Sequence, residues 1–354
     1  MNRHAQLAAF LSFALTLSLL AGYYAMARVF GILGLVGGVL FWLAVVISAL
    51  LFMAGMGLSS VLDNPSLRGL NIALSVWVGF YLVLIFFLIF FDILSLVVPW
   101  PDHRTAGIAI IVHAAVLAAA AAANARFVRT RRVKVPARDL KKPLRLVQLS
   151  DLHLGPVNGL KYFKDIVRRA NLEKPDVVLI TGDLIDGRLT DEIFSPINEL
   201  EAPAFFVPGN HEEYVGMEEF LAHLARTKAV PLCNRKVDLG AFVLAGIDFD
   251  WNKRGLEGMV AKVAPANGKY SILMSHGPPA FDAARKAGFD LTVSGHTHGG
   301  QFWPFTMFGR LFVKYRLGLY EKDGKHLFVT SGTGTWGPPL RLGTNSEMAV
   351  IDIG

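Results

Sequence analysis

Two histidines, His296 and His298, stand at alternate positions in a glycine-flanked segment near the C-terminus. At the end of a strand, side chains two residues apart point the same way, so both imidazole rings can reach one metal ion. The flanking glycines let the backbone approach such an ion closely. Taken alone, a His-x-His pair is only a weak indication of a metal site.

Four earlier segments also carry residue types that ligate metals, and each follows an apolar run rich in β-branched residues. In chain order they are Asp151-Leu152-His153, Gly182-Asp183, Gly209-Asn210-His211-Glu212 and Ser275-His276-Gly277. Such runs predict buried strands, so these segments are expected at the ends of successive strands. Together with the histidine pair they predict a centre with mixed oxygen and nitrogen ligands.

Single residues of this set have ordinary alternatives. Asp151 and Asp183 are of a type that is common in turns and helix caps. His153 or His276 alone is more often a hydrogen-bonded histidine without a metal, and Asn210 alone is a turn residue. Their joint occurrence at predicted strand ends favours the metal centre.

The five segments, in this order, resemble the calcineurin-like metallophosphoesterase superfamily over about residues 144–354. The pattern of that family is Asp-x-His, Gly-Asp, Gly-Asn-His-Asp/Glu, a single His and Gly-His-x-His. The stretch from Gly295 to Gln301 resembles more specifically its membrane-associated bacterial branch. The resemblance implies an α/β fold, a four-layer α/β/β/α sandwich, and hydrolysis of a phosphoric ester or anhydride at two divalent metals.

The resemblance also implies how the ligands are shared. Asp183 is the expected bridge, because a shared anion relieves the repulsion between two cations. One metal would take Asp151, His153, Asp183 and His298, and the other would take Asp183, Asn210, His276 and His296. Mn, Fe or Zn suits such ligands better than Ca or Mg alone, and the sequence does not choose among the three.

Three further residues are candidates for roles at the same site. The resemblance implies that His211 contacts the phosphate and acts as the catalytic proton donor to the leaving group; a purely orienting role is the alternative. Asp186 is a candidate acceptor for a metal-ligating histidine, or else a helix cap. Arg341 is a candidate contact to a substrate phosphate, with an ordinary surface arginine as the alternative.

The chain is too apolar, with 53% hydrophobic residues and a mean hydropathy of +0.43, for a wholly soluble protein of 354 residues. The apolar excess lies in four segments that are each long enough to cross a bilayer. They are residues 6–27, 32–58, 70–98 and 107–125. We therefore expect a four-helix transmembrane domain at 1–126, a basic juxtamembrane linker at 127–143 and a phosphoesterase domain at 144–354.

The net charge of +7 raises the question of a nucleic-acid partner. A dense basic cluster between Arg126 and Lys134, however, directly follows an apolar segment, which favours anionic membrane lipids as the partner. No nucleic acid is expected. The oligomeric state is not predicted, and the one cysteine, Cys233, excludes an internal disulfide.

Two ionisable residues, Asp92 and His113, fall inside the apolar segments. In an antiparallel pair of helices they are expected at similar depth. A structural contact between them, or snorkelling to the interface, is one interpretation, and a lipid or proton site is the other.

The stretch of residues 301–320 is rich in aromatic and basic residues. It follows the histidine pair directly, so it is expected beside the metals. We predict that Phe305 and Phe308 contact an acyl-bearing substrate or membrane lipid. A loop folded onto the sandwich is the alternative.

These features predict a multi-pass inner-membrane enzyme that hydrolyses a phosphodiester or pyrophosphate bond in a lipid-linked, amphiphilic substrate. A UDP-diacylglucosamine-type molecule, implied by similar proteins, is the sharpest candidate. One alternative is a phosphatase or phosphodiesterase for soluble nucleotides. Another is a membrane sensor or scaffold whose hydrolase is vestigial, which the complete ligand set disfavours.

Lysines and arginines in the loops predict that both termini, and so the catalytic domain, are cytoplasmic. Arg3 and Arg68 lie on the same side as the basic cluster, whereas the other side has only Arg28 and Arg104. A reporter that is active only outside the cytoplasm should be inactive when fused to the C-terminal residue 354 and active when fused near residue 102. The reverse pattern would contradict the cytoplasmic placement.

Overall fold

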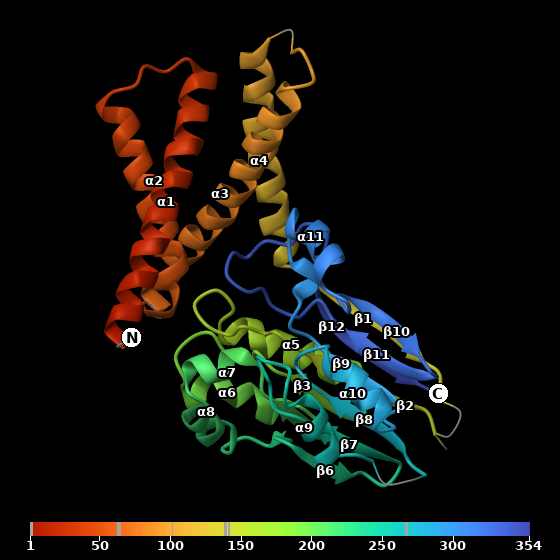
Figure 1. The fold of residues 1–354 in the computed structure, drawn as a ribbon. Helices are drawn as coiled ribbons and strands as arrows, with labels where there is room; N and C mark the ends of the chain where they lie inside the picture. The colour runs from red at the N-terminus through yellow and green to blue at the C-terminus, as the bar shows by residue number, and fades with distance from the viewer. Residues whose placement is uncertain (1–2, 62–64, 101, 138–139, 141, 266–267) are drawn as a thin grey trace. The chain divides into compact units, whose positions relative to one another are not determined.

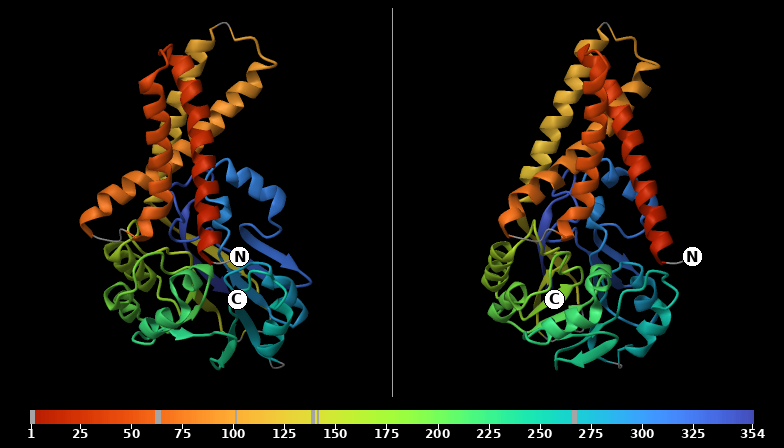
Figure 2. Two further views of the ribbon diagram at one scale, coloured as in Figure 1. Left: turned by 60° about the vertical axis from the view of Figure 1, so that its left-hand side comes forward. Right: turned by 90° about the vertical axis from the view of Figure 1, so that its left-hand side faces the viewer.

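The computed structural model describes residues 3–61, 65–100, 102–137, 140, 142–265 and 268–354. The chain divides into two compact units (Figure 1). The first comprises Met1–Ala123 with Gly337–Leu340, and the second comprises Asn124–Trp336 with Arg341–Gly354. In Figure 2 the helices of the first unit run from red to amber, and the second unit runs from yellow to blue.

Long apolar helices make up the first unit. They are α1 (Arg3–Leu33), α2 (Val39–Val61), α3 (Arg68–Ser95) and α4 (His103–Ala125), with a short 3-10 turn η1 (Pro65–Leu67) before α3. Within the described residues, each of the four contains a segment that is long and apolar enough to cross a membrane. The four predicted spans are thereby confirmed as helices.

Asp92 is paired inside the helical unit, although not with His113. The guanidinium of Arg28, on α1, lies 2.5 Å from the Asp92 carboxylate, and the Tyr24 hydroxyl donates to it at 2.9 Å. His113 instead packs its ring against Phe87 at 5.4 Å. Of the interpretations that the sequence allowed, the contact between Asp92 and His113 is therefore replaced by a pair with Arg28. A neighbouring arginine neutralises the carboxylate more completely than a histidine would.

Two six-stranded mixed sheets form the second unit. The first has the order β1-β12-β2-β3-β4-β5, and the second has the order β10-β11-β9-β8-β7-β6. The strands of the first sheet are β1 (Val128–Val135), β12 (Ser346–Ile353), β2 (Leu144–Leu149), β3 (Val177–Thr181), β4 (Ala204–Val207) and β5 (Val230–Pro231). Those of the second are β10 (Gly318–Lys322), β11 (Lys325–Val329), β9 (Leu291–Ser294), β8 (Tyr270–Met274), β7 (Phe242–Gly246) and β6 (Arg235–Asp238).

Parallel pairing dominates the centres of both sheets. Strands β2, β3, β4 and β5 are mutually parallel, as are β11, β9, β8 and β7. The antiparallel pairs are β12 with β2, β10 with β11, and β6 with β7. The carboxyl ends of the central strands in each sheet therefore lie along one edge.

Helices cover the outer faces of the sheets. The first sheet packs against α5 (Leu160–Leu172) and α8 (Met217–Leu224), and the second packs against α9 (Leu256–Lys262) and α10 (Ala280–Lys286). A third core, between the sheets, includes Leu179, Ile272 and Val293, which are completely buried. The remaining short elements are α6 (Asp191–Phe194), η2 (Ser195–Glu199), α7 (Asn210–Val215), η3 (His298–Gly300) and α11 (Phe305–Phe312). The predicted four-layer sandwich is confirmed.

The predicted linker at 127–143 contains a strand instead. Residues Val128–Val135 form β1, which pairs in parallel with β12 at the edge of the first sheet. Val133 and Val135 enter the core between the sheets, while Lys134 and Arg132 point outward. This alternation was masked by the many basic residues, so residues 128–135 of the predicted linker are instead a strand of the catalytic sheet. Residues 138–139 and 141 of that segment lie outside the described part of the chain.

Candidate metal centre

Five loops at the carboxyl ends of parallel strands bring the predicted ligand residues together. Asp151 and His153 follow β2, Asp183 follows β3 and Asn210 follows β4 in the first sheet. In the second sheet, His276 follows β8, and the His296–His298 pair follows β9. Because both sheets present the same kind of edge, the seven residues converge from two sides.

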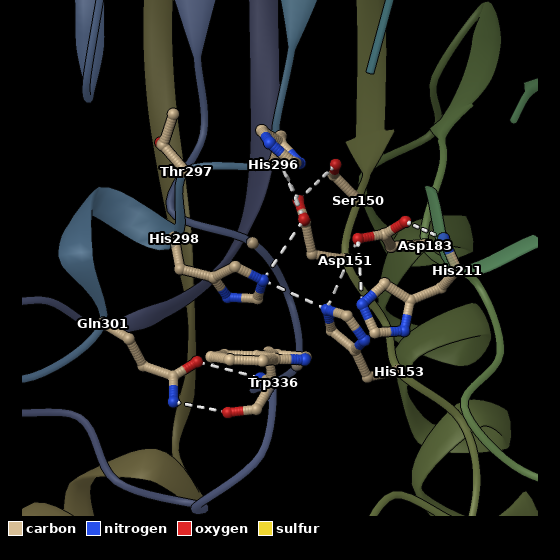
Figure 3. A network of polar contacts seen from close by, with 12 residues as sticks. Ser150, Asp151, His153, Asp183, His211, His296, Thr297, His298, Gln301 and Trp336 are labelled. Atoms are coloured by element: carbon tan, nitrogen blue, oxygen red, sulfur yellow. Dashed lines mark hydrogen bonds and ion pairs between the residues drawn. The ribbon is translucent and has the colours of Figure 1, made fainter. Parts of the chain in front are cut away.

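Asp151, His153 and His298 form a first cluster, which Figure 3 shows at its centre. The Nε2 atoms of His153 and His298 are 3.0 Å apart, and His298 Nε2 is 3.3 Å from Asp151 Oδ1. All three residues are buried. One cation can therefore contact an oxygen and two ring nitrogens here.

Asp183, His276 and His296 form a second cluster. His276 Nε2 lies 3.1 Å from Asp183 Oδ2 and 3.0 Å from His296 Nδ1. The same Asp183 oxygen lies 3.9 Å from His153 Nε2, in the first cluster. Asp183 thus reaches both clusters, as a bridging carboxylate must.

Asn210 supplies an independent test of whether the residues fit a metal. Its side-chain oxygen is buried and has no hydrogen-bond partner. Leaving a buried acceptor unsatisfied costs about 1–3 kcal/mol. A divalent cation would satisfy this oxygen, and carbonyl oxygens are suitable ligands for it. The residues present therefore fit a pair of divalent metals.

Neighbouring carboxylates raise the pKa values of two histidines in the clusters. Burial lowers the pKa of His276, but the carboxylate of Asp183 outweighs this effect, and the pKa is raised to about 10. His153 is also buried, yet Asp186 and neighbouring carboxylates raise its pKa to about 9. The protein groups thus hold positive charge on two histidines. Metal ions can take the place of those protons, so binding them releases protons.

The other two histidines are neutral at physiological pH. Burial lowers the pKa of His298 to about 4, and burial together with the charge of His276 lowers the pKa of His296 to about 4. Their ring nitrogens therefore offer lone pairs to a metal without first losing a proton.

Five of the predicted ligands adopt a left-handed backbone, which is uncommon for residues other than glycine. Their φ angles are 52° at Asp151, 46° at His153, 50° at Asp183, 70° at His296 and 48° at His298. Such conformations cost on the order of 1–3 kcal/mol each and cluster at functional sites. Surrounding hydrogen bonds hold these turns in place. The amide of Asp151 donates to the Gly182 carbonyl at 3.0 Å, and that of His153 to the Asp183 carbonyl at 3.0 Å.

Glu212 is a functional residue that sequence reasoning left without a role. Its buried carboxylate accepts hydrogen bonds from the backbone amides of Asp183 at 3.0 Å, Leu184 at 2.7 Å and Gly209 at 2.7 Å. It therefore fixes the turn that carries Asp183 against the turn that precedes Asn210. Its place at the end of the Gly-Asn-His-Glu segment was the available signal.

His211 and His153 share one carboxylate. Asp186 Oδ1 lies 2.6 Å from His211 Nδ1 and 2.8 Å from His153 Nδ1. The predicted contact of Asp186 with a metal-ligating histidine is present, and it extends to His211. The other ring nitrogen of His211 lies 3.9 Å from Asp183 Oδ2, so it faces the centre.

Arg341 does not face a substrate. It is completely buried, and its guanidinium donates to the backbone carbonyls of His298 at 3.0 Å, Ser331 at 2.7 Å and Gly334 at 2.6 Å. The predicted phosphate contact is therefore wrong. A fork of five donors is suited to holding several loop carbonyls, and here it supports the turn that carries His298.

A cavity of about 610 Å³ adjoins the second cluster at His296. Phe249 and Trp251 line one side, and Phe312 and Val313 at the end of α11 line another. The ring of Phe249 also contacts those of His276 and His296, at 5.6 and 5.2 Å. The cavity is therefore continuous with the centre and has aromatic walls. Its charged lining residues are the basic Lys253, Lys314 and Arg316 and the acidic Asp248, Asp250 and Asp282.

Phe305 and Phe308 lie on α11 but are not among the residues that line this cavity. Both are about half exposed. The segment was correctly placed beside the centre, but Phe312 and Gly309 line the cavity rather than these two.

Comparisons with known proteins agree with this geometry. Residues 144–300 match the family model of the calcineurin-like phosphoesterases. A metallophosphoesterase of Aquifex aeolicus is 34% identical over 242 residues, which are 64% of this chain and 92% of that protein. The chain belongs to the calcineurin-like metallophosphoesterases.

Other metallophosphoesterases are similar to this chain. A zebrafish (Danio rerio) transmembrane protein with a metallophosphoesterase domain is 32% identical over 313 residues, 77% of this chain and 71% of that protein. A Campylobacter jejuni metallophosphoesterase is 37% identical over 231 residues, 62% of this chain. The chain spans about 61% of the length of that relative.

Replacement of Asp183 by asparagine tests the bridging position. Asp183→Asn removes the anion that both clusters share, so the protein should retain fewer metal ions and lose activity by roughly 100-fold or more. Elemental analysis and hydrolysis of a small phosphodiester measure the two effects. Asp238→Asn, an exposed aspartate paired with Lys269, is the control and should change neither. Full metal content with near-normal turnover in Asp183→Asn would exclude the two-metal assignment.

Replacement of His211 separates proton transfer from metal binding. His211→Ala should keep both metals, because His211 lies outside the Asp151 and Asp183 clusters; in its own group, with His153 and Asp186, the shared carboxylate already bonds both rings. The rate should fall, and the loss should be smaller for a substrate with an acidic leaving group, which needs little protonation. Equal losses for good and poor leaving groups would argue against the proton-donor role.

Proposed function

We propose that this chain is a membrane-anchored phosphodiesterase that hydrolyses a phosphodiester or pyrophosphate bond in an amphiphilic, lipid-linked substrate. The observation that carries the proposal is the cavity beside His296, which joins aromatic walls to a complete set of metal ligands. Such a substrate needs an apolar surface for its hydrocarbon and a polar centre for its phosphate. The cavity and the two clusters together supply both.

Within this function, the ligand residues would hold two divalent metals, Mn, Fe or Zn. The first would lie among Asp151, His153 and His298, and the second among Asn210, His276 and His296, with Asp183 between them. When bound, such metals supply an activated water and neutralise charge on the phosphoryl oxygens.

The protein groups perform the remaining steps. His211 donates a proton to the leaving oxygen through the ring nitrogen that faces the centre. Asp186 accepts a hydrogen bond from the other nitrogen, so it fixes the orientation of the ring. Phe249 excludes water from the side of the centre next to the cavity, since it packs on His276 and His296.

The walls of the cavity favour a particular orientation of the substrate. Phe312 and Val313 offer an apolar surface for hydrocarbon, whereas Lys253 lies on the side of Trp251. Lys314, by contrast, pairs with Asp282 at 2.8 Å and is partly neutralised. Hydrocarbon would thus lie along α11, and the phosphate would lie toward the metal ligands at His296. A UDP-diacylglucosamine-type molecule fits this description.

We also propose that the protein is in the inner membrane with its catalytic unit in the cytoplasm. The bias of lysine and arginine in the loops supports this orientation. Membrane lipids are the proposed partners, and nucleic acid is not. A nucleotide-linked lipid would be made on this side of the membrane, so orientation and substrate class agree.

Hydrolysis of soluble nucleotides is the second candidate function. Trp251 and Tyr214 are more than half exposed, and their rings are 6.0 Å apart, beside His211. Exposed rings of this kind can stack on a nucleobase. The apolar lining that Phe312 and Val313 give to the cavity itself is not needed in that reaction, so we favour the lipid-linked substrate.

Replacement of Phe312 distinguishes the two candidates. In detergent, Phe312→Ser should lower kcat/KM for a lipid-linked phosphodiester by about tenfold, or ~1.4 kcal/mol, because apolar contact with the substrate is lost. Hydrolysis of bis(p-nitrophenyl) phosphate should change little. Leu172→Ser, at an exposed position on α5, is the control. An equal loss on both substrates with lower thermal stability would show a structural role. No change on either would favour soluble nucleotides.

A further inference from the structure

Helix α11 presents a row of large apolar side chains to solvent. The exposed fractions are 48% for Phe305, 42% for Phe308, 73% for Leu311 and 82% for Phe312. Spacings of three and four residues place them on one side of the helix. Thr306, by contrast, is buried against the rest of the unit at 8% exposure. So much apolar surface on one short helix is uncommon for a face that meets only water.

The helix begins close to the point at which the chain leaves α4. The side-chain amide of Asn124, near the end of α4, donates to the backbone carbonyls of Arg341 at 3.0 Å and Thr344 at 3.1 Å. The Thr344 hydroxyl in turn donates to the carbonyl of Gln301 at 2.5 Å. Two hydrogen-bonded steps therefore connect the last turn of α4 with the segment that leads into α11.

Further contacts fix the same edge of the second unit. Ser346, the first residue of β12, donates to the Ala125 carbonyl at 3.1 Å. Only Arg126 and Phe127 separate α4 from β1, and Phe127 is 67% exposed. Figure 1 shows α11 at the end of the second unit from which β1 starts.

The helix that directly precedes this edge of the second unit is α4. Asn124 and Ala125 end a helix whose segment His103–Ala125 is long and apolar enough to cross a membrane. The junction to β1 is too short to move the edge far from the bilayer surface, since two extended residues span about 7 Å. The apolar face of α11 thus belongs to the same edge of the second unit as the residues that directly follow this helix.

The charges around α11 agree with an interfacial position. Arg310 is exposed on the helix, and Arg126 is exposed at the junction. Arg316 turns inward to donate to the Gly299 carbonyl. An amphipathic helix with large apolar residues and nearby arginines is the kind that lies in the headgroup region of anionic membranes.

We propose that the exposed face of α11, formed by Phe305, Phe308 and Leu311, is a membrane-contact surface that inserts into the headgroup–acyl boundary. The occupant is the lipid bilayer that the four long helices cross. This surface does not depend on which phosphoester the enzyme hydrolyses. It would exist even if the substrate were a soluble nucleotide.

The test uses the full chain in lipid nanodiscs that each hold one copy. Cys233→Ser removes the single native cysteine, and Leu311→Cys then carries an environment-sensitive fluorophore. Phe308→Cys provides a second position on the same face. Val230→Cys, on the edge strand at the opposite side of the first sheet, is the control, and its 47% exposure is close to that of Phe305. Hydrolysis of a small phosphodiester confirms that each labelled protein is folded.

The labels are quenched either by nitroxide lipids in the nanodisc or by iodide in the water. At positions 311 and 308, nitroxide lipids with a shallow label should quench at least about threefold more than at 230, and iodide should quench less. Strong iodide quenching with no lipid quenching at 311 and 308 would overturn the proposal. Protection from both quenchers would mean that protein covers the face, and this too would overturn it. Neither result depends on the substrate, so the proposed function is tested separately.

Discussion

The catalytic edge depends on the placement of one buried carboxylate. Asp183 contacts the second cluster through Oδ2, which lies 3.1 Å from His276 Nε2. Its other oxygen accepts the backbone amide of His211 at 3.0 Å, and its carbonyl accepts that of His153 at 3.0 Å. A buried carboxylate is costly unless positive charge and donors surround it. The groups that stabilise the buried carboxylate of Asp183 belong to the same residues that the chemistry requires. Burying Asp183 therefore also assembles the site.

Buried polar groups also need hydrogen-bond partners in the loops around the clusters, which are rich in buried backbone carbonyls and amides. Arg341 satisfies carbonyls of four different residues, and Glu212 satisfies amides on two turns. Gln301 pairs with both backbone groups of Trp336, at 2.7 and 2.9 Å. Loops that carry ligands cannot use the hydrogen bonds of a sheet, so polar side chains supply them. This explains why a charged arginine is fully buried without facing a substrate.

The sequence was most informative where chemistry demands particular residue types in order. The histidine pair and the four earlier segments could be placed at strand ends because apolar runs precede them. It was least informative where an outcome depends on distant parts of the chain. The alternation at Val133 and Val135 becomes visible only once β12 pairs with β1, and nothing local to Arg341 indicates that loops will enclose it. Phe249 lies far from both histidines that it contacts, so its role required the fold.

The connection between His298 and α11 would have a consequence for catalysis if α11 contacts a membrane as proposed. Residues 301–304 are all that separate the turn η3 from the helix, and Arg316 ties the turn back from the far side through the Gly299 carbonyl. Helix α11, which would contact lipid, and His298, which would bind a metal, are therefore linked by a short and hydrogen-bonded segment. Turnover would then respond to the physical state of the interface, with a rate in bilayers that differs from the rate in dispersed micelles at equal substrate concentration. Interfacial activation of this kind needs no separate regulatory domain.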